Sequence, residues 1–122
     1  VNNLTYDYDK AETVETGYLP DVDETLSTKT GICFDYAALT TAMLRSCDIP
    51  CKLQIGYTGD IKHAWIDVYI RSKGWVTGAV SFNGDSWSLM DPTFDSSADS
   101  DDTEAIQDYI GNADNYTVQF TR

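Results

Sequence analysis

The chain has 122 residues, 42% of them hydrophobic, which is the size and composition of a single globular domain over residues 1–122. Its formal net charge of −12 repels phosphate backbones and anionic lipids, which argues against nucleic acids and anionic membranes as partners. No apolar stretch approaches the roughly 18 to 20 residues of a membrane span, and three cysteines are too few for a disulfide scaffold.

The N-terminal segment, residues 1–30, carries acidic and small polar side chains with a few tyrosines among them. Pro20 breaks any long helix here, so we expect an irregular wrap or a short strand followed by a turn. The chain begins at Val1 instead of Met, and we therefore expect it to be part of a longer protein.

A helix is predicted over residues 32–46. The segment CFDYAALTTAMLRS contains no Gly or Pro and is rich in Ala, Leu and Met, which favour a helix. Thr30 and Gly31 are small, turn-permissive residues of the kind found before a helix start, and they place Cys33 in the first turn. Pro50 marks the end of the element.

After this helix, the apolar period becomes alternating and predicts a strand over residues 51–57, a turn at 57–60 and a second strand over 63–70. One face of the second strand is predicted to be core, and it carries Ala64, Ile66, Val68 and Ile70. The other face is expected to be at least partly polar, and it carries His63, Trp65, Asp67 and Tyr69.

Further strand is predicted within residues 71–94. Asn83-Gly84 is the tight turn of a hairpin, and SWSLM is a strand that ends at Asp91. The acidic stretch DSSADSDDTE lacks the glycine and ligand spacing of a calcium loop, so we expect a solvated loop and no metal site. A short helix over 104–110 and a strand over 116–120 complete the chain.

Cys33 is the candidate nucleophile. A free cysteine usually packs as a small hydrophobe, but the N-terminus of a helix stabilises a thiolate through its dipole and free amides. A cysteine enzyme also needs a base, and His63 is the only imidazole in the chain. Considered alone, such a histidine is more often a surface or hydrogen-bonded strand residue, so the case depends on what surrounds it.

A third group must orient the imidazole. Asp67 shares a strand face with His63, but four strand residues separate them by about 13 Å, which is too far for a hydrogen bond. Asp91 is the better candidate because it ends a later strand that can pair beside the first.

Three sequence blocks occur in order, GICFDYAALTTAMLRSCDIPCKLQIGY, then KHAWIDVYI, then WSLMDPTF. Together they resemble the transglutaminase-like superfamily, whose pattern runs from a Gly-x-Cys helix through His-Ala-Trp to Asp-Pro-Thr. The match covers residues 29–95, and the tail resembles bacterial members. This resemblance implies a papain-like α+β fold in which a cysteine-bearing helix packs on an antiparallel sheet.

The resemblance also implies catalytic roles. Cys33 would be the nucleophile, His63 the general base and acid, and Asp91 the group that holds the imidazole. The thiolate would attack a carboxamide or peptide carbonyl and form a thioester. Trp65 would flank the site and contact substrate, with burial in the sheet as the alternative.

The resemblance further implies two donors for the oxyanion, one of them the backbone amide of Cys33. In the family, the second donor is commonly a side chain that precedes the cysteine, and this chain has no tryptophan there. Tyr6, Tyr8 or Tyr18 could replace it, as could a residue elsewhere in a longer parent protein.

The expected function is cysteine-dependent acyl transfer at peptide or glutamine amide bonds, with hydrolysis favoured over cross-linking to an amine. The alternative is a catalytically idle module of the same fold that binds peptides or proteins. A protein or peptide substrate is expected, with no cofactor, no metal, no nucleic acid and no membrane insertion. The resemblance and the acidic, tyrosine-rich composition favour secretion or attachment to the cell envelope.

Two smaller points remain open. Cys47 and Cys51 could form a small loop disulfide or remain as two buried free thiols. Asp35 is expected to be a first-turn charge that complements the helix dipole, and not a catalytic acid.

Overall fold

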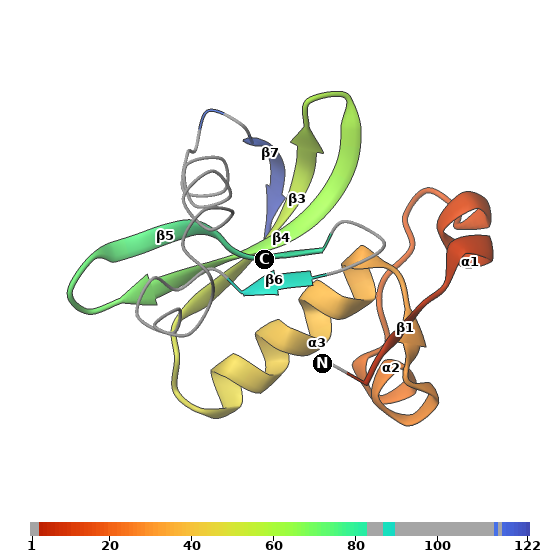
Figure 1. Cartoon of the computed structure of the whole chain (residues 1–122), viewed down its shortest axis with the longest axis horizontal. Helices are drawn as coiled ribbons and strands as arrows, with labels where there is room; N and C mark the ends of the chain where they lie inside the picture. Colours follow the sequence, from red (N-terminus) through yellow and green to blue (C-terminus); the bar gives the residue numbers. More distant parts are fainter. Residues whose placement is uncertain (1–2, 83–86, 90–113, 115) are drawn as a thin grey trace, which may run out of the picture.

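The structure is a computed structural model of the chain, and it describes residues 3–82, 87–89, 114 and 116–122. In chain order the elements are β1 (Thr5–Tyr6), α1 (Tyr8–Thr13), α2 (Val22–Thr28), β2 (Thr30–Gly31), α3 (Cys33–Ser46), β3 (Cys51–Thr58), β4 (Ile61–Ile70), β5 (Gly74–Phe82), β6 (Trp87–Leu89) and β7 (Tyr116–Thr121). A five-stranded antiparallel sheet has the order β6-β5-β4-β3-β7, and α3 lies against one face of it (Figure 1). The fold is the expected α+β arrangement.

The N-terminal segment differs from the expectation of an irregular wrap, because it contains two short helices. Asp7 caps α1 by accepting from the backbone amide of Lys10, and Asp21 caps α2 by accepting from two amides of its first turn. The chain then pairs β1 with β2 in parallel. These elements gather beside the N-terminal end of α3 (Figure 1). The short strand was expected and is present as β1, but the two helices were not expected, because the aspartate caps were not taken into account.

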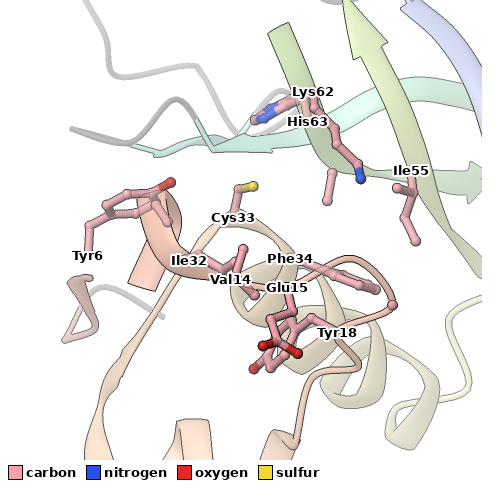
Figure 2. Close-up of a pocket in the computed structure, with 13 residues that line it drawn as sticks. Tyr6, Val14, Glu15, Tyr18, Ile32, Cys33, Phe34, Ile55, Lys62 and His63 are labelled. Carbon is pink, nitrogen blue, oxygen red and sulfur yellow. The ribbon is translucent and has the colours of Figure 1, made fainter. Parts of the chain in front are cut away.

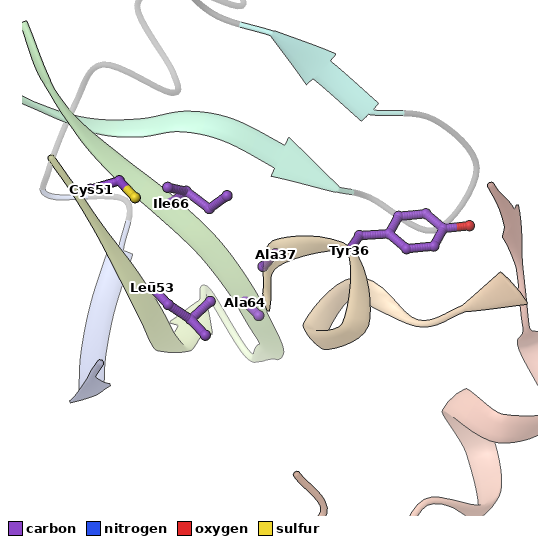
Figure 3. Close-up of a cluster of buried hydrophobic side chains, with 6 residues drawn as sticks. All are labelled: Tyr36, Ala37, Cys51, Leu53, Ala64 and Ile66. Atoms are coloured by element: carbon purple, nitrogen blue, oxygen red, sulfur yellow. The ribbon is translucent and has the colours of Figure 1, made fainter. Parts of the chain in front are cut away.

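Helix α3 is confirmed over the predicted range, and it supplies one side of the main core. Figure 3 shows this core between α3 and the central strands; its buried members are Tyr36, Ala37, Cys51, Leu53, Ala64 and Ile66. The alternating pattern of β3 and β4 correctly predicted which face meets the helix. Ile66 is fully buried, and burying a side chain of this size contributes about 1.5–3 kcal/mol.

The second face of β4 is also largely buried, because β4 is the central strand of the sheet. Trp65 is 0% exposed and packs on Tyr116 of β7, with ring centroids 4.8 Å apart. Asp67 is buried beside it and accepts a hydrogen bond of 2.9 Å from Gln54 Nε2. This face is polar in part, as expected, but its tryptophan belongs to a second small core.

The strand register confirms both predicted hairpins, but four residues separate the paired ends of the second, in place of the tight turn expected at Asn83-Gly84. Thr58 pairs with Ile61 across the first turn, and Phe82 pairs with Trp87 across the second. Strand β7 returns to pair with β3 and confirms the C-terminal strand. The turn at 83–86, Asp91, the acidic loop and the helix expected over 104–110 lie outside the described residues. Within the described ranges, no helix is both long and apolar enough to cross a membrane.

Candidate active site

Cys33 is the first residue of α3, so its side chain sits at the positive end of a helix of 14 residues. The preceding residue, Ile32, is extended and has no side-chain oxygen to cap the helix. The Asp35 carboxylate contributes to the cap instead, because it accepts a hydrogen bond of 2.8 Å from the Ile32 backbone amide. Figure 2 shows the resulting geometry, with the Cys33 thiol directed toward β4.

The surroundings of the Cys33 sulfur act on its charge in opposing ways. Burial raises the pKa of the thiol above its ordinary value of 9.0, and the nearby charge of Asp35 adds to that rise. The backbone amides of Ala64, Phe34 and Cys33 itself hydrogen-bond toward the sulfur and lower the pKa. The net effect is a raised pKa, so Cys33 is a thiol at neutral pH.

His63 projects from β4 into the same pocket as Cys33 (Figure 2). Its ring stacks on that of Trp65, with centroids 6.4 Å apart and an interplanar angle of 19°. Burial lowers the pKa of His63 below its ordinary value of 6.5, so the imidazole is neutral at neutral pH. A neutral imidazole beside a thiol is the protonation state of a general base that takes the thiol proton during attack.

The other residues predicted for the site have different outcomes in the structure. Asp91 lies outside the described residues, so its place beside His63 stays a prediction. Asp67 accepts a hydrogen bond from Gln54 Nε2, and its exclusion as the group that orients the imidazole stays a prediction. Trp65 is fully buried and is not among the residues that line the pocket.

Among the three tyrosines considered as oxyanion donors, Tyr6 is the one beside Cys33 (Figure 2). Burial raises the pKa of Tyr6, and charge on the Cys33 sulfur raises it further once the thiol ionises, although the Cys33 backbone amide, which hydrogen-bonds to the Tyr6 oxygen, lowers it. The hydroxyl therefore stays protonated and can donate. Tyr18 instead donates to Asp35, and Tyr8 is 56% exposed with its side chain outside the pocket lining.

The pocket has a volume of about 230 Å³. Its lining combines the N-terminal segment, the start of α3 and the β3–β4 hairpin: Tyr6, Ala11, Val14, Glu15, Gly17, Tyr18, Ile32, Cys33, Phe34, Ile55, Lys62, His63 and Ala64. Most of these side chains are apolar. Periodicity in the sequence did not indicate that the N-terminal segment contributes to the pocket, because that segment has no long helix or strand.

The remaining cysteines and acidic residues make no further site in the described part of the chain. All three cysteines are free; Cys47 is exposed and Cys51 is buried, where its thiol donates to the Thr41 carbonyl at 3.6 Å. Cys47 and Cys51 are therefore both free thiols, as one of the two alternatives predicted, but only Cys51 is buried. Over the described ranges, no cluster of three His, Cys, Asp or Glu side chains is placed to hold a metal.

A helix that starts at a cysteine and packs on an antiparallel sheet carrying a histidine is the arrangement of a papain-like α+β fold. The model of the transglutaminase-like superfamily matches residues 1–92. This chain belongs to that superfamily.

Two curated proteins are similar to part of this chain. UPF0252 protein MJ1282 of Methanocaldococcus jannaschii is 43% identical over 53 residues, and the uncharacterised protein YebA of Bacillus subtilis is 33% identical over 75. The matches cover 39% and 46% of this chain but only 15% and 10% of those proteins. This chain therefore corresponds to a small part of each of them.

Two solved structures are similar to this chain. A crystal structure of a TGase aligns with a TM-score of 0.52 at 17% identity, over 76% of this chain and 26% of the other. A proposed cysteine protease from Cytophaga hutchinsonii aligns with a TM-score of 0.48 at 26% identity, over 62% of this chain and 25% of the other. The first alignment supports the transglutaminase-like fold.

Proposed function

We propose that this domain is a cysteine hydrolase of peptide or glutamine amide bonds that works through a thioester. The observation that carries the proposal is that Cys33, at the first position of α3, and His63, on β4, line one pocket. Membership of the superfamily supports the reaction class. Transfer of the acyl group to an amine in place of water is the related alternative.

In the proposed reaction, His63 takes the proton of the Cys33 thiol as the sulfur attacks the carbonyl carbon. The Cys33 amide, which donates to the Tyr6 oxygen in the free domain, donates instead to the oxygen that becomes negative, and the Tyr6 hydroxyl donates to that oxygen as well. His63 then protonates the departing nitrogen, the C–N bond breaks and a thioester remains. Water hydrolyses the thioester and regenerates the thiol. Asp91 is proposed to hold the imidazole in the required orientation.

A catalytically idle binding module is the second candidate. The raised pKa of the Cys33 thiol and the lowered pKa of His63 favour it, because they oppose a preformed thiolate and imidazolium pair. The two functions differ in one observable, which is whether an acyl group ever becomes attached to Cys33.

The test is a search for that acyl enzyme. The protein is incubated with a tryptic digest of casein, quenched in acid and examined by mass spectrometry for acyl adducts on Cys33, with Cys33→Ala as the control. Adducts together with shortened or deamidated peptides support the hydrolase. Incorporation of added monodansylcadaverine into peptides supports amine transfer. Peptide binding with neither adduct nor product favours the idle module.

Secretion or attachment to the cell envelope is proposed for the protein. The support is the acidic composition, with 20 acidic residues against 8 basic ones, and the superfamily resemblance. Fractionation of the source cells, followed by detection with an antibody against the domain, tests this placement.

A further inference from the structure

The wall of the Cys33 pocket that faces the sheet comes from the N-terminal segment, here residues 4–18. At its start, the segment is anchored by Leu4 and Tyr6, which pack against the main core, and by a short parallel pair in which the Asp7 amide donates to the Gly31 carbonyl at 2.9 Å. Farther along, none of the residues of α1 is buried. Polar side-chain contacts therefore help to hold the part of the wall that follows Asp7.

Those contacts converge on Asp35, whose side chain is 0% exposed at the third position of α3. Lys10 forms an ion pair with it, Nζ to Oδ2 at 2.9 Å, and the Tyr18 hydroxyl donates to Oδ1 at 2.5 Å. Lys10 Nζ also donates to the Tyr18 oxygen at 2.6 Å. A buried carboxylate loses its hydration and needs such partners, so Asp35 binds the segment to the start of α3.

The same network continues into the apolar lining through one side chain. The hydroxyl of Tyr18 bonds to Asp35, while its ring packs edge-on against Phe34 with centroids 6.2 Å apart. Burial and the hydrogen bond to Asp35 raise the pKa of Tyr18, so its hydroxyl remains a donor at neutral pH. Phe34 follows Cys33 in the chain, which puts this contact next to the nucleophile.

The size and lining of the pocket indicate what it holds. Its volume of about 230 Å³ is smaller than the ~300–1,000 Å³ of pockets for drug-sized ligands, so it suits one side chain and not an extended peptide. On the side of Cys33 away from Tyr6, Figure 2 shows Val14, Phe34 and Ile55 around the space, together with the charged Glu15 and Lys62, which are both exposed. Val14, Phe34 and Ile55 offer an apolar surface to a substrate.

We propose that this pocket selects substrates with an apolar group beside the carbonyl that Cys33 attacks, and that Lys10, Tyr18 and Asp35 hold the wall that makes the selection. The inference rests on the proposed role of Cys33 as nucleophile. In this scheme Lys10 and Asp35 are positioning residues. Tyr18 both positions the wall and lines the pocket.

The test compares two alkylating reagents with the same reactive group, iodoacetamide and N-benzyl iodoacetamide. Alkylation rates at Cys33 are measured by site-resolved mass spectrometry, and the benzyl preference is the ratio of the two rates. Exposed Cys47 lies outside the pocket and gives the intrinsic ratio of the reagents in the same sample. Dividing the two ratios removes differences in reagent chemistry.

In the wild type, the benzyl preference at Cys33 is expected to exceed that at Cys47 by about tenfold, the usual size of discrimination by an apolar pocket. Lys10→Met and Tyr18→Phe are expected to lower it toward the Cys47 value. Lys10→Arg, which keeps the charge, should restore most of it. Lys73→Met, in the turn between β4 and β5, is the matched control and should keep the wild-type preference.

Circular dichroism verifies that each variant is folded. Asp35→Asn is included in the alkylation assay if its spectrum matches that of the wild type. Equal preferences at Cys33 and Cys47 in the wild type, or no reaction at Cys33 with either reagent, would overturn the apolar pocket. A preference that survives Lys10→Met and Tyr18→Phe would overturn the role of the network. The alkylation assay needs no catalytic turnover. If the pocket is selective but no acyl enzyme is ever detected, the proposed function is wrong and this inference still holds.

Discussion

Gly31 leaves the space that Asp35 fills. A Cβ built on Gly31 would lie 2.7 Å from the Cβ of Asp35 and 2.9 Å from its Oδ2, closer than side chains tolerate. The carboxylate cannot easily move, because Lys10 and Tyr18 hold it. The glycine two residues before Cys33 therefore has a physical reason: it allows a buried acid on the first turn of the nucleophile helix.

Replacing Gly31 by alanine is predicted to destabilise the protein by about 1–3 kcal/mol, the usual cost of overpacking. Urea denaturation followed by circular dichroism measures the free energy of unfolding. Ser27→Ala, at an exposed site in α2, is the control and should change it by less than about 0.5 kcal/mol. A Gly31→Ala protein as stable as the control would show that the contact with Asp35 relaxes freely.

The side chains of Cys33 and His63 are both predicted to be uncharged at pH 7. Because the thiol pKa is raised, alkylation of Cys33 by iodoacetamide should increase with pH and reach half its maximum above pH 9.0. Because the imidazole pKa is lowered, His63 stays neutral to below pH 6.5, so kcat/KM should fall only as the pH drops through that lower value.

The control is His63→Ala, measured by the same alkylation assay. For a neutral pair, this change leaves the alkylation midpoint near its wild-type value. A thiolate and imidazolium pair would behave in the opposite way, with alkylation already fast at acid pH and a midpoint that moves upward when His63 is removed. That result would contradict the neutral pair.

Tyr6→Phe is predicted to lower kcat by about 10²- to 10³-fold with little change in KM, because a hydroxyl that donates to an oxyanion acts mainly in the transition state. Steady-state kinetics on a peptide found by the acyl-enzyme search gives both constants. Tyr8→Phe is the matched control, since Tyr8 neighbours Tyr6 in sequence but is 56% exposed. Equal losses in the two variants would remove Tyr6 from the proposed machinery.

Gly56→Ala is predicted to separate β7 from the sheet. A Cβ on Gly56 would lie 1.9 Å from the backbone oxygen of Thr117, at the point where the register between β3 and β7 shifts. Hydrogen exchange should show faster exchange of the β7 amides. The control is Thr117→Ala, which leaves that backbone oxygen in place and should exchange like the wild type. Unchanged protection in Gly56→Ala would mean that the two strands can move apart locally.

The local features of this protein are determined by the sequence itself. A run free of Gly and Pro makes α3, alternating apolar residues make β3 and β4, and Gly31 and Cys33 mark where the helix begins. These signals depend on neighbours a few residues apart, so a reader of the sequence can recognise them. The aspartate caps of α1 and α2 are also local signals, because each aspartate directly precedes the helix that it caps.

The tertiary structure decides which of several equivalent side chains reaches the site. Sequence alone offers Tyr6, Tyr8 and Tyr18 as donors, but the docking of the N-terminal segment brings Tyr6 to Cys33 and turns Tyr18 toward Asp35. From the sequence, Asp35 is predicted to be an ordinary first-turn charge, and only the structure shows that it forms an ion pair with Lys10. Contacts of this kind join segments far apart in the chain, and they exist only because burying the core between α3 and the sheet brings those segments together.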